Sequence, residues 1–291
     1  MNPHPPFPHQ KETPLCEFST FGIGGPARYF AEAHTCEQMQ QMLSYAHNAA
    51  LRTLIIGKGS NCLFDDRGFN GLAILNRIDY LQEHENGLFR VGAGYSFARL
   101  GGITARQGWS GLEFASGIPA TVGGAIYMNA GANGQDTSAT LAEVGYVTAS
   151  GELQRLKREE LSFDYRFSSF QKREGAIVEG LFQLKPSIGA KQTQKELLGY
   201  RLKTQPYGEK SAGCAFRNTD SGPAGKLIEE CGLKGVRVGG AAVSGMHANF
   251  IVNTRGATTQ DVLDLMRCIK ERVYAEKGVI LEEEIRHISY E

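Results

Sequence analysis

The sequence lacks the long apolar run that a membrane span requires. No stretch approaches roughly 18 consecutive apolar residues, and the N-terminus has no apolar core of the kind that a signal peptide carries. Lys and Arg total 31, as do Asp and Glu, so no net charge favours a nucleic-acid backbone or an anionic lipid surface. We therefore expect a cytoplasmic protein with neither a nucleic-acid partner nor a membrane partner.

Metal and disulfide patterns are missing as well. The six cysteines form no Cys-x-x-Cys pair, and no group of Cys and His residues has the spacing of a zinc site. The seven histidines are scattered singly along the chain. We therefore expect free thiols and no metal centre, with each histidine in a structural or surface role unless the fold gathers them.

What the sequence does contain is an ordinary globular composition with an unusual beginning. Hydrophobic residues make up 41% of the 291 positions, enough for one large domain or two to three modest ones. The first fourteen residues include five prolines and few apolar residues, which predicts a mobile N-terminal arm over 1–14. The polar segment 187–195 has no apolar period and predicts a linker after the first large part of the chain.

Periodic patterns predict helices mixed with strands. Helical patterns that begin with a capping residue or a proline lie at 35–50, 96–107, 223–231 and 258–278. Apolar runs or alternations typical of strands lie at 53–56, 71–75, 143–148, 176–184 and 279–288. Asn86-Gly87 predicts a hairpin between two further strand-like runs, because this dipeptide accepts the positive φ angles of a type I′ turn.

Two glycine-rich segments are candidates for ligand binding. Gly57-Lys58-Gly59-Ser60-Asn61 follows a predicted strand, and its glycines let main-chain N–H groups turn toward one point, which suits a pyrophosphate. The stretch 117–134 is so rich in small residues that its main chain could lie against a large planar or phosphorylated ligand. A plain turn and a structural loop are the alternatives. Neither segment completes the dinucleotide-binding Gly-x-Gly-x-x-Gly pattern or a Walker A motif.

Together, GKGSN at 57–61 and GIPATVGGAIYMNAGANG at 117–134 resemble the FAD-binding region of the UDP-N-acetylenolpyruvoylglucosamine reductase family. Further segments similar to this family follow in the same order: DYRFSSF at 164–170, SAGCAFRN at 211–218, 223–235 with HANFIVN at 247–253, and LEEEIR at 281–286. The resemblance thus spans about residues 15–288.

The resemblance implies an α+β fold with two parts. The first is a two-lobed FAD-binding region of the vanillyl-alcohol-oxidase/PCMH type at 15–187, with lobes at about 15–77 and 78–187. The second is a smaller α+β substrate-binding domain at 188–291, whose C-terminal strand returns a catalytic glutamate to the active site.

The resemblance also implies an activity. It is the NADPH-dependent reduction of the enolpyruvyl ether of UDP-N-acetylglucosamine enolpyruvate to UDP-N-acetylmuramate, a step of peptidoglycan precursor synthesis. Hydride passes from reduced FAD to C3 of the enolpyruvyl group, and a proton must reach C2. The matching catalytic positions are Arg166, Cys214 and Glu284. The positions that match cofactor contacts are Gly57, Lys58, Gly59, Ser60, Asn61, Ser116, Gly117, Ile118, Thr121, Gly123, Gly124, Asn129, Gly131 and Ala132. Candidates for substrate contacts are Lys203, Gln205, Asn218 and Asn249, and we expect a monomer acting on this small UDP-sugar.

Each catalytic assignment has a plainer alternative. Arg166 could hold the substrate carboxylate with two hydrogen bonds, or it could pair with Asp164 or another carboxylate. Cys214 stands where many family members carry serine, and a thiol yields its proton more readily than a hydroxyl group, although it could also be an inert buried side chain. Glu284 could remain protonated on a half-buried surface and donate a hydrogen bond, with Glu282 as its rival.

Departures from the family concern the subtype and the local geometry. Ala120 and Lys58 stand where glycine is frequent, and Arg217 stands where lysine is usual. Only 36 residues separate Arg166 from Lys203, too few for the tyrosine-bearing insertion of one subgroup, so we infer the shorter subtype. Two rival functions stay open: a related FAD-dependent alcohol oxidase and a catalytically silent nucleotide-binding protein.

Overall fold

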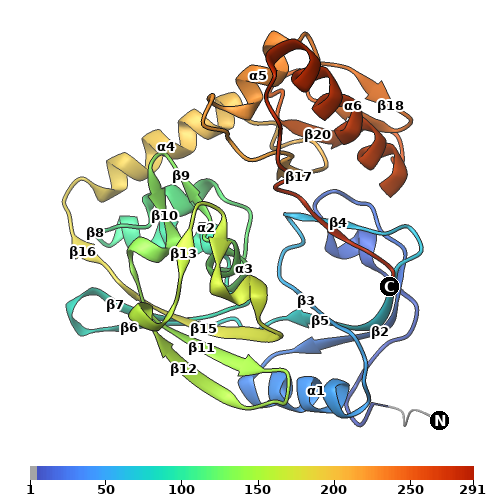
Figure 1. Cartoon of the computed structure of the whole chain (residues 1–291). Helices are drawn as coiled ribbons and strands as arrows, with labels where there is room; N and C mark the ends of the chain where they lie inside the picture. The colour runs from blue at the N-terminus through green and yellow to red at the C-terminus, as the bar shows by residue number, and fades with distance from the viewer. Residues whose placement is uncertain (1–4) are drawn as a thin grey trace. The chain divides into compact units, whose positions relative to one another are not determined.

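The computed structural model of the chain describes residues 5–291 (Figure 1). These residues form two compact units, each assembled from separate parts of the chain. Unit 1 contains the N-terminal residues through Gln10, 29–58 and 71–201. Unit 2 contains 11–28, 59–70 and 202–291.

This division differs from the boundary that the sequence predicts at residue 187. Residues 188–201 group with unit 1, and the segments 11–28 and 59–70 group with unit 2. The assignment of 15–187 to FAD and of 188–291 to substrate stays a prediction, because compactness alone does not tell which residues bind which ligand.

Two sheets carry most of the strands numbered up to β15. One four-stranded sheet has the order β1 (Thr13–Pro14), β2 (Pro26–Ala33), β5 (Phe69–Asn76) and β3 (Thr53–Ile56), with β3 parallel to β5. The boundaries of the units fall within β2 and β5. The five-stranded sheet of unit 1 is antiparallel and has the order β12 (Leu153–Lys157), β11 (Leu141–Thr148), β15 (Gly175–Gln183), β7 (Leu88–Gly92) and β6 (Leu81–His84).

Three helices of unit 1 lie beside these sheets (Figure 1). They bury apolar residues against them. In α1 (Cys36–Asn48) the buried residues Met39, Met42, Leu43 and Ala46 recur at helical spacing, and they pack with residues of β5, β11 and β15. α2 (Phe97–Arg106) and α3 (Val122–Met128) pack in a second cluster with residues of β7 and β11. Each fully buried Met or Leu stabilises the fold by about 1.5–3 kcal/mol relative to exposure.

Two local predictions in unit 1 are confirmed. β6 and β7 form the expected hairpin, and Asn86 and Gly87 have φ angles of 59° and 75° in its loop. Thr35 caps α1 by accepting a hydrogen bond from the N–H of Gln38 at 3.3 Å, and Ser96 caps α2 in the same way through Arg99.

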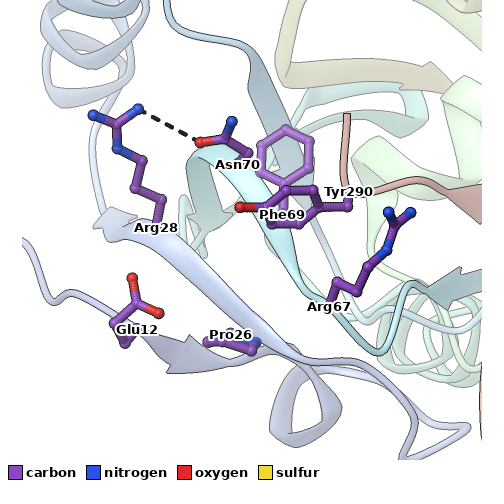
Figure 2. A pocket seen from close by; sticks show the side chains of 7 residues that line it. All are labelled: Glu12, Pro26, Arg28, Arg67, Phe69, Asn70 and Tyr290. Carbon is purple, nitrogen blue, oxygen red and sulfur yellow. Dashed lines mark hydrogen bonds between the residues drawn. The ribbon is translucent and has the colours of Figure 1, made fainter.

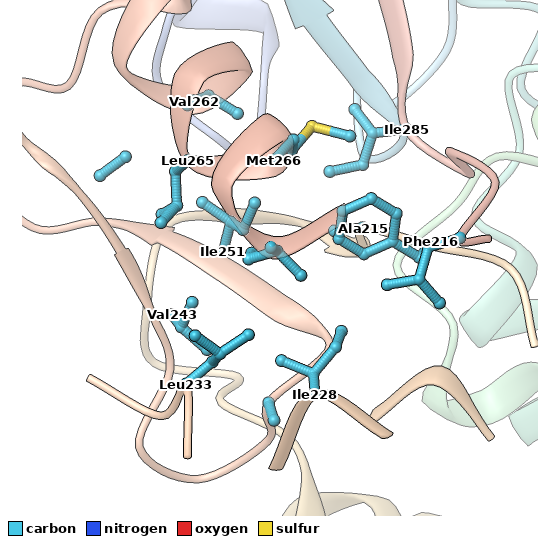
Figure 3. Close-up of a cluster of buried hydrophobic side chains, with 14 of the residues drawn as sticks. Ala215, Phe216, Ile228, Leu233, Val243, Ile251, Val262, Leu265, Met266 and Ile285 are labelled. Atoms are coloured by element: carbon cyan, nitrogen blue, oxygen red, sulfur yellow. The ribbon is translucent and has the colours of Figure 1, made fainter. Parts of the chain in front are cut away.

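Unit 2 has its own sheet and core. Its antiparallel sheet has the order β17 (Ser211–Cys214), β20 (Phe250–Asn253), β19 (Ala241–Val243) and β18 (Arg237–Val238). α6 (Thr259–Lys277) places Val262, Leu265 and Met266 against this sheet, and Figure 3 shows them facing Ile251. α5 (Ala224–Glu230) completes this core together with Phe21, Ile23 and Leu63 from much earlier in the chain.

Distant parts of the sequence are also joined by strand pairing in unit 2. β4 (Cys62–Phe64) runs parallel to β21 (Arg286–Ile288), so two segments more than 200 residues apart in the sequence share one short ladder. The predicted helix from Thr258 is confirmed as α6: its Thr258 and Asp261 side chains form a reciprocal capping box, and it ends at Gly278 with a φ of 68°.

The remaining elements are short, apart from one helix. They are η1 (Leu15–Phe18), η2 (Glu85–Gly87), β8 (Trp109–Ser110), η3 (Glu113–Gly117), β9 (Gly131–Ala132), β10 (Gln135–Asp136), η4 (Thr137–Ala139), η5 (Arg158–Glu160), β13 (Phe163–Asp164), β14 (Phe167–Ser168), η6 (Ser169–Lys172), β16 (Lys185–Pro186) and α4 (Ala190–Thr204). The predicted linker at 187–195 is wrong over its second half, because α4 begins at the buried residue Ala190.

The predicted N-terminal arm differs from the structure where the structure describes it. Phe7 is buried and contacts the ring of Tyr45 edge-on at 5.5 Å, so it fills a gap beside α1. Gln10 exchanges two main-chain hydrogen bonds with Phe30, and Thr13 pairs with Ala27. Prolines restrict the chain to extended conformations, and here the extended chain pairs with a strand edge instead of remaining unpaired. Residues 1–4 of the predicted arm lie outside the described residues.

The predicted C-terminal strand is also shorter than expected. Only Arg286–Ile288 pair as β21, while the residues before them make a single bridge between Glu283 and Phe216. Glu284 is half-buried, as expected, whereas Ile280, four residues earlier, is 72% exposed. Leu281 and Ile285 are both buried, as the alternation predicts.

Two further properties concern residues 5–291 as a whole. In this part of the chain no helix combines the length and apolar character needed to cross a membrane. Within the same residues, no group of three or more Cys, His, Asp or Glu side chains is placed to hold a metal ion.

Candidate active site

The loop 57–61 follows β3 and depends on glycine at two positions. A Cβ atom on Gly57 would lie 2.3 Å from Oγ1 of Thr121, within unit 1. Gly59 has a φ of 63°, and a Cβ atom there would lie 2.0 Å from the carbonyl oxygen of Phe18, within unit 2. In the part of the chain that the structure describes, the N–H groups of Lys58, Gly59 and Ser60 have no hydrogen-bond acceptor. Such unpaired N–H groups at a glycine turn fit an anionic group of a ligand.

The second glycine-rich segment uses its donors inside unit 1. Thr121 caps α3 by accepting from the N–H of Gly124 at 3.3 Å. The N–H of Val122 donates to Tyr95 and that of Gly123 donates to Ala93, at 2.9 and 2.8 Å. A Cβ atom on Gly123 would lie 2.9 Å from the Cβ of Ala93, so close packing against the residue that follows β7 requires this glycine. The first turn of α3 therefore has few main-chain donors left for a ligand.

Ser116, one of the predicted cofactor residues of unit 1, has a hydroxyl group that its neighbours within residues 5–291 leave without a hydrogen bond. Its hydroxyl oxygen is one of four buried side-chain oxygens without a hydrogen-bond partner among the described residues. A buried hydroxyl group without a partner is costly, and a bound ligand with a polar atom would satisfy it. The residues around it, Gly117 and Ile118, are buried and half-buried and continue η3 toward Thr121.

Asn129 holds the end of α3. It adopts a left-handed conformation with a φ of 42°, which Asn tolerates better than most residues. Its side-chain amide donates to the carbonyl of Asp164 at 3.0 Å and accepts from the N–H of Ser138 at 3.0 Å. Its side chain therefore ties α3 to the segment that carries Arg166, and a direct side-chain contact to the cofactor is not needed to explain it.

Arg166 is joined to the predicted cofactor segment. Its Nη2 donates to the carbonyl of Gly131 at 3.0 Å, and Ala132 continues from there as part of β9. Arg166 lies in the two-residue turn between β13 and β14 with a φ of 54°, an uncommon backbone conformation for a residue with a long side chain. Gln171 donates to the carbonyl of Arg166 at 3.1 Å and to that of Tyr127 at 3.0 Å. The turn is thereby fixed to the end of α3.

Cys214 and Glu284 are brought together by main-chain contacts within unit 2. Cys214 ends β17, where it lies opposite Phe250. The next residue, Ala215, accepts a hydrogen bond from the N–H of Glu284 at 2.8 Å, and Arg217 donates its N–H to the carbonyl of Glu282 at 2.9 Å. Both Cys214 and Glu284 are half-buried. The predicted proton donor and the predicted acid thus belong to adjoining segments.

Asn61 reaches the same place from the glycine-rich loop. Its side-chain amide donates to the carbonyl of Glu284 at 3.2 Å, and its own carbonyl accepts from the N–H of Arg286 at 3.0 Å. Asn61 therefore positions the main chain of Glu284, a role for which the sequence offers no local pattern. Burial raises the pKa of the neighbouring thiol of Cys62 to about 11, with the charge of Arg286 opposing, so Cys62 stays protonated.

The structure separates the three glutamates of the C-terminal motif. Glu282 is exposed and lies 3.6 Å from the guanidinium of Arg217, and Glu283 pairs with Lys270 at 3.1 Å. Glu284 is the more buried member of this run. This geometry favours Glu284 over Glu282 as the acid.

The four candidate substrate residues differ in their surroundings. Lys203 is exposed near the end of α4, and Gln205 follows that helix. The side-chain oxygen of Asn218 accepts from the N–H of Ala224 at 3.1 Å and so helps to begin α5. Asn249 is buried, and its side chain bonds to the main chain of Phe216.

A separate hollow of about 310 Å³ lies in unit 2 (Figure 2). Its lining residues are Glu12, Pro26, Arg28, Arg67, Phe69, Asn70 and Tyr290. Arg28 donates to the side-chain oxygen of Asn70 at 3.5 Å, the dashed line in Figure 2. None of the site residues predicted from the sequence lines this hollow.

Comparison with known proteins identifies the class first. A model of an FAD binding domain matches residues 27–157. A model described as UDP-N-acetylenolpyruvoylglucosamine reductase, C-terminal domain, matches residues 205–288. The chain is therefore an FAD-dependent oxidoreductase with a second conserved domain after the flavin domain, and the predicted α+β fold class is confirmed.

The relatives and a solved structure then give the family. The chain is 56% identical over 286 residues to the UDP-N-acetylenolpyruvoylglucosamine reductase of Protochlamydia amoebophila, covering 98% of this chain and 96% of that protein. It is 46% identical over 288 residues to the reductase of that name from Chlamydia pneumoniae, covering 99% and 94%. A crystal structure of the Thermus caldophilus enzyme matches with a TM-score of 0.82 and 35% identity, covering 96% of this chain and 99% of that one. The chain belongs to the UDP-N-acetylenolpyruvoylglucosamine reductase family.

Proposed function

We propose that this chain reduces the enolpyruvyl ether of UDP-N-acetylglucosamine enolpyruvate to UDP-N-acetylmuramate, with NADPH as reductant, as a step of peptidoglycan precursor synthesis. Its family membership supports the substrate class. The observation that carries the chemistry is the hydrogen bond from the N–H of Glu284 to Ala215, which places the acid segment beside Cys214. We take the chain to be the shorter subtype and to act as a monomer.

Cys214 supplies the proton in this proposal. A bound FAD would supply the hydride that C3 of the enolpyruvyl group receives, with NADPH as the source of that hydride. The electron pair of the C2–C3 double bond then moves to C2, where it takes the proton of the Cys214 thiol as the S–H bond breaks. Solvent reprotonates the thiolate afterwards. General acid catalysis of this kind contributes about 10²–10⁴-fold to a rate.

Arg166 and Glu284 stabilise the charge that develops on the substrate carboxylate. The guanidinium of Arg166 stays charged at neutral pH and can hold a carboxylate with two hydrogen bonds. Its turn is fixed by Gln171 and by the bond to Gly131, so the side chain starts from a defined position. Glu284, if protonated, donates a hydrogen bond to the same developing charge.

The predicted binding residues divide into two groups in this proposal. For the cofactor, the loop from Gly57 through Asn61 holds the pyrophosphate with main-chain donors, and Ser116 contributes its hydroxyl group. For the substrate, Lys203, Gln205 and Asn218 remain the candidates. The FAD-binding region at 15–187 and the substrate-binding domain from 188 are kept as a functional division.

A flavin spectrum followed through both half-reactions tests the proposal. We expect NADPH to bleach the visible flavin absorbance under anaerobic conditions, and the UDP-enolpyruvyl sugar to restore it. Bleaching by an alcohol without NADPH would instead identify an oxidase. A flavin that NADPH bleaches but the sugar does not reoxidise would reject the proposed substrate, and a protein without flavin would reject the enzyme altogether.

A further inference from the structure

Asn249 lies at the centre of a hydrogen-bond network beside Cys214. It is 2% exposed and precedes β20. Its side-chain oxygen accepts from the N–H of Phe216 at 3.0 Å, and its side-chain amide donates to the carbonyl of Phe216 at 2.8 Å. Its main-chain carbonyl accepts from the N–H of Ala215 at 2.7 Å. One residue thus makes three hydrogen bonds to the two residues that follow Cys214.

The strand at Cys214 needs this support because its regular pairing is interrupted. β17 pairs with β20 at Ser211 and Cys214, with an irregularity between the two positions. Gly213 has a φ of 78°, so the chain turns sharply just before the thiol. Beyond Cys214, the side-chain amide of Asn249 replaces the main-chain partner that a regular ladder would provide for Phe216.

Ala215, in the segment that Asn249 holds, also bonds to the segment that contains Glu284. The carbonyl of Ala215 accepts from the N–H of Glu284 at 2.8 Å, and Asn61 bonds to the carbonyl of Glu284 at 3.2 Å. A continuous series of hydrogen bonds therefore runs from Asn249 through Ala215 to Glu284. Displacing Phe216 and Ala215 would move the thiol and the carboxyl group relative to each other.

We propose that Asn249 is a positioning residue that fixes the thiol of Cys214 relative to Glu284 for proton delivery to the substrate. This inference rests on the function proposed above. The sequence makes Asn249 a candidate for binding substrate. Both polar ends of its side chain already bond to main chain, so we assign it a positioning role instead. A displacement of about 1 Å at a reacting group can lower a rate by about 100-fold.

The substitution Asn249→Asp tests this role with a change of one functional group. The carboxylate still accepts from the N–H of Phe216, but it faces the carbonyl of Phe216 without a donor. Protonation restores that donor, because a carboxylic acid can accept and donate as the amide does. We expect NADPH to reduce the flavin at nearly the wild-type rate, while reoxidation by substrate slows by about 10- to 100-fold at neutral pH and recovers as the pH falls.

Asn253 offers a matched control on the same strand. Its side chain also makes two hydrogen bonds to main chain, donating to Phe21 at 3.1 Å and accepting from Ala257 at 2.9 Å, but it does not hold the Cys214 segment. Asn253→Asp should reduce thermal stability without changing the ratio of the two half-reactions. Alkylation of Cys214 by iodoacetamide, followed by peptide mass spectrometry, should change in rate in Asn249→Asp and not in Asn253→Asp.

A double variant separates this proposal from the proposed function. In a Cys214→Ala background, adding Asn249→Asp should slow reoxidation by a much smaller factor than it does in the wild type, because the positioned thiol is already gone. Equal effects of Asn249→Asp and Asn253→Asp on reoxidation and alkylation would overturn the positioning role and leave the proton donor intact. Normal turnover by Cys214→Ala alone would reject the proton donor instead. If Asn249→Asp does not fold, the uncharged variant Asn249→Ser is measured in the same assays and judged by reoxidation and alkylation alone, without the recovery at low pH.

Discussion

The turn of Arg166 in unit 1 is held by side chains, whereas the segments of Cys214 and Glu284 in unit 2 are joined to each other by main-chain hydrogen bonds, with the side chains of Asn61 and Asn249 in support. In unit 1, Asn129, Ser168 and Gln171 each bond to carbonyl groups and so fix the end of α3 and the turn of Arg166. In unit 2, main-chain hydrogen bonds join the segments after Cys214 and around Glu284. Because these bonds are made by main chain, substituting the side chain of Cys214 or Glu284 should leave them in place.

The glycine-rich segments show a second contrast. In loop 57–61, three successive N–H groups have no acceptor among the described residues, whereas the first turn of α3 uses its N–H groups within unit 1. Both segments have the composition of a phosphate-binding loop. Only the first also has the free donors, so glycine content alone does not identify the part that binds the anion.

The largest expected effect tests whether unit 2 keeps its main-chain structure when the side chain of Cys214 is removed. Cys214→Ala should fold normally and leave flavin reduction by NADPH unchanged, but slow reoxidation by the UDP-sugar by about 10³-fold, because the proton donor is lost. Cys214→Ser should keep substantial activity. Stopped-flow absorbance measures both half-reactions separately.

Cys268 provides the matched control, since it is also a half-buried free cysteine of unit 2 but lies on α6. Cys268→Ala should leave both half-reactions unchanged. An equal loss in the two variants would show that the effect comes from a general disturbance of unit 2.

The next effect concerns Gly57, the residue of unit 1 that begins loop 57–61. Gly57→Ala places a Cβ atom 2.3 Å from Oγ1 of Thr121, so the cap of α3 must move. We expect loss of the cap to reduce stability by about 1 kcal/mol and FAD affinity to fall by at least about tenfold. Fluorescence titration of the apoprotein with FAD gives the affinity. Gly189→Ala, where the nearest atom would be 3.9 Å away, should bind FAD as the wild type does.

Local order in this chain follows from local residues, which is why much of it could be predicted. Thr258, Asp261 and Gly278 bound a helix through interactions within a few residues of one another. Asn86-Gly87 likewise sets its own turn. The packing of unit 2 is different, because Phe21 and Leu63 join a core made mostly from residues after 211, and no local pattern encodes such a pairing.

The site shows the same limit. Resemblance to the family selects Cys214 and Glu284, and a main-chain hydrogen bond joins their segments in unit 2. The resemblance does not predict the hydrogen-bond partners of an asparagine side chain. The partners of Asn129 and Asn249 are main-chain groups far away in the sequence. For such residues, only the folded main chain distinguishes a ligand contact from a structural one.

The charged cluster in the sheet of unit 1 should make a smaller contribution, to stability. Glu179 is buried and bonds to Tyr80, Arg90 and Arg155. Burial alone would raise the pKa of Glu179, but the hydrogen bonds from Tyr80 and Arg155 and the charge of Arg90 lower it overall. Because the folded-state pKa is lowered, the stabilisation is present above the unfolded value of about 4.3 and is lost as the pH falls through the folded value.

Glu179→Gln should therefore lower the free energy of unfolding at neutral pH by about 2 kcal/mol, since it leaves the partly buried guanidinium of Arg90 without this carboxylate. Urea denaturation at several pH values measures the change, and the difference from wild type should shrink toward pH 3. Glu159→Gln, at an exposed position of unit 1, should change neither quantity. A constant difference at all pH values would assign the effect to packing instead of charge.

The smallest effect concerns the corresponding ion pair of unit 2. The hydrogen bonds from the guanidinium of Arg67 lower the pKa of Asp65 to about 2, with the N–H groups of Arg67 and Tyr290 contributing. The stabilisation is full above the unfolded pKa of about 3.9 and disappears as the pH falls toward 2. Because the Arg67 side chain is 69% exposed, solvent screening reduces the expected loss in Asp65→Asn to about 1 kcal/mol.

Acid titration of the unfolding midpoint should show this loss between about pH 4 and 2, whereas Asp264→Asn, at an exposed pair on α6, should leave the midpoint unchanged. A larger loss of stability in Asp65→Asn than in Glu179→Gln would contradict this order of the two ion pairs. Asp65 would then stabilise the fold mainly through its hydrogen bond from the N–H of Tyr290 and less through its charge.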